Sequence, residues 1–96
     1  MAALSKVEIH EKLKEMHGWS YVGKSIQKRY SLKSFMPAIA LVNMIAEAAE
    51  KVQHHPDITI NYNIVGILLS THSEGGVTQK DFDLALEIDT LAESHS

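Results

Sequence analysis

The sequence predicts an α+β fold in which helices pack on one face of a four-stranded antiparallel sheet. Three segments repeat apolar residues every three or four positions, which is typical of amphipathic helices, and four shorter runs alternate or cluster β-branched residues. These runs form two adjacent pairs joined by short turns, and such pairs favour antiparallel strands. The predicted order is α-β-β-α-β-β-α, in one domain over residues 1–96.

The first helix is predicted to start after Ser5 and to end at Gly18. Ser5 and Glu8 have the S-x-x-E spacing of a capping box, and a glycine commonly follows the last turn of a helix. Residues 19–22 are predicted to pair with residues 26–32 across a Gly-Lys turn, because apolar and polar side chains alternate in the second run.

The second helix is the longest apolar periodic segment. We predict that Ser34 caps its start and that it ends near Gln53. Pro56 requires this end, because proline lacks an N–H and disfavours the helical conformation of the residue before it.

The second half of the chain repeats the pattern of two strands and a helix. Residues 58–62 and 64–69 are predicted strands, and the last helix is predicted to begin at Thr78 with Asp81 in its first turn.

A sheet with helices on one face needs polar residues or a partner on the other. The predicted polar face consists of Gln27, Arg29, Ser31, Thr59 and Asn61. The run 64–69 is mostly apolar, so we expect this last strand to pair with a second copy of the chain, giving a homodimer or a homotetramer.

Composition narrows the possible functions. The formal net charge is −3, and the nine Lys and Arg residues are scattered, so direct binding to nucleic acid is not expected. The absence of cysteine excludes disulfides and thiolate chemistry. No apolar run is long enough for a secretory signal or a membrane span, so we expect a cytoplasmic protein without a membrane partner.

Three histidines are the main candidates for chemistry. His54 and His55 stand at the predicted end of the second helix, and His72 follows the last predicted strand. Imidazole can give and accept a proton near neutral pH, so a cluster of these rings would suit acid–base catalysis on a small molecule.

Two carboxylates are expected to accompany the histidines. Glu50 lies four residues before His54, so we expect the two to pair if the helix continues that far. Asp81 is expected to orient His72 or a substrate. Together, these groups would bring three segments of the chain to one site.

Two other interpretations compete with an acid–base site. A histidine pair before Pro56 could simply end a helix. Three imidazoles and a carboxylate could also bind zinc, but His54 and His55 are adjacent, a spacing that does not favour two ligands on one ion, so no metal site is predicted. The G-x-S-x-G elbow of a serine nucleophile is absent.

With these residues in place, the chain resembles the pterin-4a-carbinolamine dehydratase family, also known as the dimerisation cofactor of a homeodomain transcription factor. The shared pattern consists of Glu50, His54-His55-Pro56, Tyr62, His72 and Asp81. Weaker similarity extends to Gly18-Trp19, Ser34-Phe35 and Ala46-Glu47. One departure is Asp57-Ile58, where many members have Glu-Trp, and it concerns the rim of the pocket rather than the histidines.

The resemblance implies a 4a-hydroxytetrahydrobiopterin dehydratase, which removes water from a 4a-hydroxytetrahydropterin to give the quinonoid dihydropterin and needs no cofactor. His54, His55 and His72 would then be catalytic, with Glu50, Asp81 and Pro56 binding or orienting the substrate. The alternatives are a non-catalytic pterin-binding protein and a protein-partner module such as a transcriptional coactivator.

Overall fold

The computed structural model describes residues 3–95 and has the predicted order of elements. The first half contains α1 (Lys6–Leu13), β1 (Ser20–Val22), β2 (Ser25–Ser31) and α2 (Phe35–Val52). The second half contains β3 (Asp57–Asn61), β4 (Ile64–Leu69), a short 3₁₀ turn η1 (His72–Glu74) and α3 (Gln79–His95). The α+β prediction is therefore confirmed.

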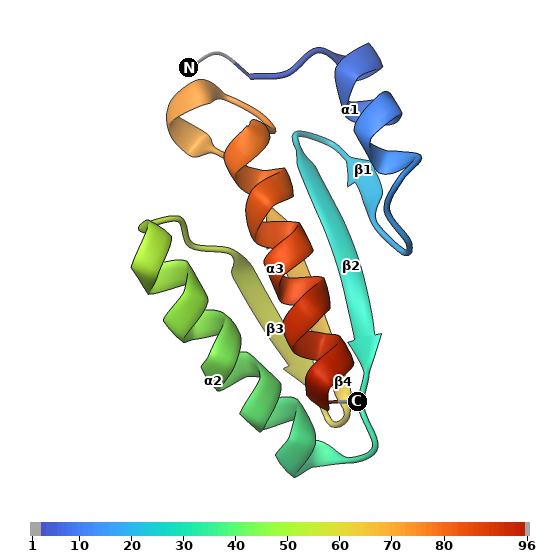
Figure 1. Ribbon diagram of the computed structural model, residues 1–96, viewed down its shortest axis with the longest axis vertical. Coiled ribbons are helices and arrows are strands. Elements are labelled where there is room, and N and C mark those ends of the chain that lie inside the picture. The colour runs from blue at the N-terminus through green and yellow to red at the C-terminus, as the bar shows by residue number, and fades with distance from the viewer. Residues whose placement is uncertain (1–2, 96) are drawn as a thin grey trace.

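The four strands form one antiparallel sheet in the order β1-β2-β4-β3. Both α2 and α3 pack on the same face of this sheet, with α3 crossing its centre and α2 beside it on the β3 side (Figure 1). The core lies between these layers and includes Ile26, Leu41, Ile45, Val65 and Ile88, all fully buried.

The other face of the sheet carries the predicted polar residues on both sides of Ile64 and Leu68 of the central strand β4. Successive side chains of a strand point to opposite faces, so the residues between the buried ones face solvent. All five predicted residues are exposed: Gln27, Arg29, Ser31, Thr59 and Asn61.

The predicted role of the last strand as a free edge is wrong. Residues 64–69 of β4 pair with β2 on one side and with β3 on the other. Val65, Ile67 and Leu69 of this run are buried against the helices, whereas Ile64, Gly66 and Leu68 alternate with them on the open face and are only partly buried. The free edges of the sheet are β1 and β3.

One predicted helix boundary also needs correction. The capping box of Ser5 and Glu8 is present, but α1 ends at Leu13 rather than at Gly18. In the next turn the Glu15 N–H donates to the Lys12 carbonyl and the Met16 N–H to the Leu13 carbonyl. These hydrogen bonds join residues three apart, as in a 3₁₀-helix, rather than four apart as in an α-helix. Ser34 stands at the N-cap of α2 without a capping hydrogen bond from its side chain.

Asp89 on α3 joins the first hairpin to the helical layer. Its carboxylate accepts hydrogen bonds from Tyr30 Oη at 2.5 Å, Lys28 Nζ at 2.7 Å and Trp19 Nε1 at 3.1 Å. Burial, together with this carboxylate, raises the pKa of Tyr30 well above its ordinary range, so its hydroxyl stays a donor. Trp19 is thus a core residue.

We expect Asp89→Ala to destabilise the fold by about 2–3 kcal/mol, because it leaves three part-buried donors without their charged acceptor. Urea unfolding at neutral pH would measure this loss. Glu47→Ala, which removes an exposed carboxylate from α2, is the matched control and should unfold like the wild type. Equal midpoints for the two variants would show that the Asp89 contacts add nothing to stability.

Candidate functional site

The end of α2 determines where the histidine pair lies. Gln53 adopts the left-handed conformation, with φ of 51°. The His54 N–H then donates to the Ala49 carbonyl at 3.1 Å and the Gln53 N–H to the Glu50 carbonyl at 3.3 Å, which is the Schellman pattern of helix termination. The helix therefore ends before His54, at the position that Pro56 predicted.

His54 turns toward the first turn of α3 and contacts Asp81. Its Nε2 lies 2.5 Å from Asp81 Oδ1, and its side chain is only 12% exposed. An ionised carboxylate can only accept a hydrogen bond, so the imidazole proton is on Nε2. Among the described residues, no group bonds to Nδ1 of His54, which leaves this nitrogen as an acceptor for a ligand.

Asp81 is fully buried and has every oxygen satisfied. Its Oδ2 accepts from the Thr71 hydroxyl and from the Thr78 N–H, each at 2.9 Å. Thr71 and Thr78 also share a hydrogen bond of 2.8 Å between their hydroxyls. A buried carboxylate is tolerated only with such partners, so this network holds the charge beside His54.

His55 forms a second histidine–carboxylate pair on the surface. Its Nε2 lies 2.5 Å from Glu50 Oε2, and the side chains of His55 and Glu50 are 57% and 70% exposed. The predicted pairing of Glu50 with His54 is wrong, because the left-handed residue at 53 ends the helix and carries His54 away from the helical surface.

His72 opens the short turn η1 and is exposed. The predicted contact of Asp81 with His72 is not present: Asp81 bonds instead to His54 and to Thr71, the residue directly before His72. The hydrogen bond of Thr71 therefore brings the backbone of His72 close to the site. The imidazole ring of His72 makes no hydrogen bond with residues 3–95. Pro56, next to His55, has a trans peptide bond.

A groove beside His54 offers space for a small molecule. It has a volume of about 240 Å³. Val52 and His54 line one side at the end of α2, and side chains of α3 line the other: Lys80, Asp83, Leu84 and Glu87. It combines apolar walls with ionisable groups, which is the usual composition of a ligand site.

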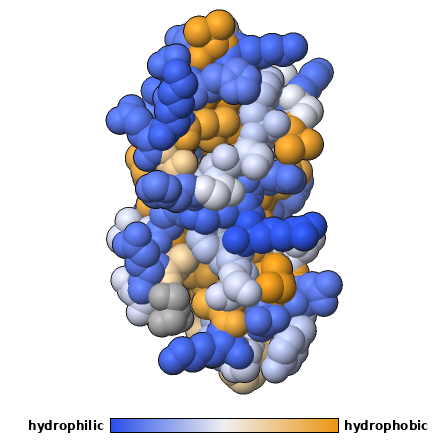
Figure 2. Space-filling model, turned by 90° about the vertical axis from the view of Figure 1, so that its right-hand side faces the viewer, coloured by the Kyte–Doolittle hydropathy of each residue, from blue (hydrophilic) through white to orange (hydrophobic). Residues whose placement is uncertain are grey.

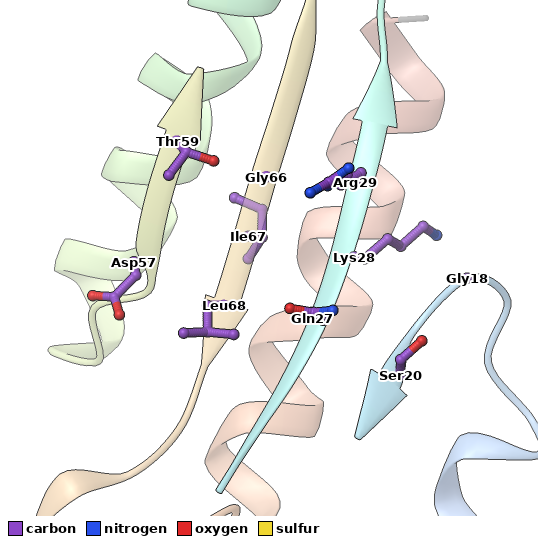
Figure 3. Close-up of a pocket in the computed structure, with 10 residues that line it drawn as sticks. All are labelled: Gly18, Ser20, Gln27, Lys28, Arg29, Asp57, Thr59, Gly66, Ile67 and Leu68. Atoms are coloured by element: carbon purple, nitrogen blue, oxygen red, sulfur yellow. The ribbon is translucent and has the colours of Figure 1, made fainter. Parts of the chain in front are cut away.

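A wider hollow of about 860 Å³ lies on the open face of the sheet. Figure 3 shows Arg29 and Thr59 on opposite sides of Gly66, with Asp57 further along β3. Gly66 places no side chain on this surface, and there is no room for one, since an added Cβ would lie 2.5 Å from Thr59 Oγ1. None of the histidines lines this hollow, so the groove at His54 is the better candidate for acid–base chemistry.

Sequence reasoning missed several residues of the site. Thr78 and Asp81 have the spacing of a capping box, which is a signal that their side chains meet, but nothing local indicated Thr71. Lys80 and Glu87 were also missed.

Within residues 3–95, no group of three or more His, Asp or Glu side chains is arranged to hold a metal ion. No helix in this range is long and apolar enough to cross a membrane.

The fold and the site define a small α+β protein with an imidazole–carboxylate pair beside a groove. A family model described as pterin 4 alpha carbinolamine dehydratase matches residues 2–91. The chain therefore belongs to this family, as the resemblance indicated.

Individual relatives agree with this assignment. A protein of Herpetosiphon aurantiacus named "Putative pterin-4-alpha-carbinolamine dehydratase" is 50% identical over 91 residues, covering 95% of each chain. A protein of Thermomicrobium roseum with the same name is 46% identical and covers 96% of this chain and 99% of its own.

Two solved structures share the fold. A transcriptional coactivator/pterin dehydratase from Brucella melitensis superposes with a TM-score of 0.90 at 35% identity, covering 94% of this chain and 98% of its own. A pterin dehydratase-like protein, identified as a RuBisCO assembly factor in the alpha-carboxysome, gives 0.69 at 26% identity, covering 80% and 92%. The names of these two structures thus refer to partners as well as to the reaction.

We expect Asp81→Asn to move the neutral proton of His54 from Nε2 to Nδ1. The asparagine keeps the shape of Asp81, but its amide nitrogen can donate to Nε2 and so favours the other tautomer. Imidazole ¹⁵N NMR at about pH 9, well above the ordinary pKa of histidine, distinguishes the two tautomers. The same tautomer in both proteins would contradict the assigned hydrogen bond.

Proposed function

We propose that this protein is a 4a-hydroxytetrahydrobiopterin dehydratase, which eliminates water from a 4a-hydroxytetrahydropterin to give the quinonoid dihydropterin. The observation that supports this most is the pair of His54 and the buried Asp81 beside a groove of small-molecule size. Membership of the family makes a pterin the substrate class to test first.

The reaction needs one proton donor and one proton acceptor. The C4a–O bond breaks as the hydroxyl takes a proton and leaves as water, and a ring N–H loses its proton as its electron pair forms the new C=N bond. In this proposal His54 is the base, because its Nε2 is held by Asp81 and its Nδ1 is unoccupied. Asp81 would stabilise the imidazolium that forms when the ring takes the proton.

His72 or His55 would deliver the proton to the leaving hydroxyl. Glu50 contacts the Nε2 of His55 and so fixes the orientation of that ring. Pro56 would help by fixing the backbone that presents His55. No metal or organic cofactor takes part in these steps.

We expect the wild-type protein to accelerate formation of quinonoid dihydropterin from 4a-hydroxytetrahydropterin generated in situ and followed by absorbance. His54→Ala should lower kcat by about 10²- to 10⁴-fold, the usual contribution of a positioned acid or base, and so should whichever of His55→Ala and His72→Ala removes the proton donor. His17→Ala is the matched control, because His17 is exposed and lines a different hollow, beside Asp89 and Thr90 in the later part of α3.

Other outcomes would favour the alternatives. Binding of a dihydropterin without acceleration would indicate a non-catalytic pterin-binding protein. Neither binding nor acceleration would favour a partner-binding module, a reading supported by the coactivator and assembly-factor relatives.

We also propose that the protein forms a homodimer or homotetramer through the β3 edge. An edge strand carries unpaired backbone groups, and short edge strands limit such pairing. The other edge, β1, has only three residues. The flank formed by α1, β1 and β2 is mostly hydrophilic, with apolar side chains in small separate groups (Figure 2). β3 is longer and includes the partly exposed Ile60.

We expect light scattering after size exclusion to give twice or four times the 10.7 kDa chain mass, and Ile60→Pro to halve the mass that the wild type shows. Asn61 and Ile64 close a two-residue hairpin and exchange hydrogen bonds with each other. Residues along an edge strand alternate between bonding inward and facing outward, so the N–H of Ile60 points away from β4. Proline is tolerated at such a position in the monomer. Ile60→Val is the control that keeps the N–H. An unchanged mass for Ile60→Pro, with a native circular dichroism spectrum, would rule out this edge.

A further inference from the structure

We infer that Glu87 recognises the pyrimidine edge of the bound pterin and sets the preference for a 2-amino ring. The inference rests on the proposed function, because it concerns how that substrate lies in the groove at His54. It assigns a specificity role to a residue outside the histidine–carboxylate pairs.

The charged side chains of the groove follow one another in a fixed order along α3. Lys80 lies next to Asp81 and therefore near the His54 end, and Glu87 lies seven residues further along the same helix. Seven residues span about 10 Å of helix, and helical side chains lean toward the N-terminus, which brings the Glu87 carboxylate back toward His54. With increasing distance from His54, the groove thus presents first the ammonium of Lys80 and then the carboxylate of Glu87.

The hydrogen-bonding groups on the pyrimidine edge of a pterin have an order that matches these two side chains. Its 4-oxo group is an acceptor attached to the carbon next to C4a, and the N3–H and the 2-amino group beyond it are two donors. A ring with C4a at His54 would present the acceptor first, to the Lys80 ammonium, and the two donors next, to the Glu87 carboxylate. A carboxylate accepts two such hydrogen bonds in parallel, as it does from arginine.

Asp83 also lines the groove, but it is less suited to this role. Its Oδ1 already accepts a hydrogen bond from Gln79 Nε2 at 2.9 Å. Glu87 has neither a hydrogen bond nor an ion pair with the described residues, so both of its oxygens are available.

The test compares the binding of two non-reacting fluorescent ligands, pterin and lumazine. Lumazine has an oxygen in place of the 2-amino group, so it would direct an acceptor at the Glu87 carboxylate. We expect the wild type to bind pterin at least about tenfold more tightly than lumazine, a difference of about 1.4 kcal/mol. In Glu87→Gln this preference should fall at least about tenfold and can invert, because an amide accepts from N3–H and donates to the second oxygen.

The controls separate this inference from the proposed function. Glu47→Gln, an equal change of charge at an exposed position of α2 outside the groove, should keep the wild-type ratio. A wild-type ratio in Glu87→Gln would overturn the inference and leave the dehydratase proposal standing. If neither ligand binds the wild type and no dehydration occurs, both proposals fail. Because Glu87 is exposed, Glu87→Gln should unfold at the same temperature as the wild type.

Discussion

The buried carboxylate of Asp81 is the interaction on which the site depends. A charge with 0% exposure would be strongly unfavourable if any partner were missing. Its partners come from three separate parts of the chain: the loop after β4 supplies Thr71, the start of α3 supplies Thr78, and the segment after α2 supplies His54. Satisfying one carboxylate therefore fixes the relative positions of these segments, and the same bonds orient the imidazole.

This arrangement depends on where α2 ends. If the helix continued through His54, that ring would lie on the helical surface near Glu50 and away from α3. The left-handed Gln53 ends the helix one residue earlier, and its side chain supports the turn by donating to the Glu50 carbonyl at 2.7 Å. The adjacent histidines consequently point to different carboxylates, so one pair is sheltered and the other faces solvent.

Local sequence signals predicted the elements, whereas long-range pairings could not be read from them. The capping box at Ser5, the alternation in β2 and the helix stop before Pro56 act over a few residues, and all three are present. The central position of β4 and the contact between His54 and Asp81 join residues far apart in the chain. The apolar run of residues 64–69 fits either an edge that self-associates or a central strand, and periodicity alone does not distinguish them.

Two acidic residues of α3 carry out separate tasks. Asp81 in its first turn organises the histidine site, and Asp89, eight residues or about 12 Å further along, binds the first hairpin through Trp19, Lys28 and Tyr30. Contacts at this separation without shared partners contribute almost independently to stability. The helix is thus attached to the sheet by a network remote from the groove, and the exposed groove residues between the two acids, Asp83 and Glu87, can vary to suit a ligand without loosening the fold.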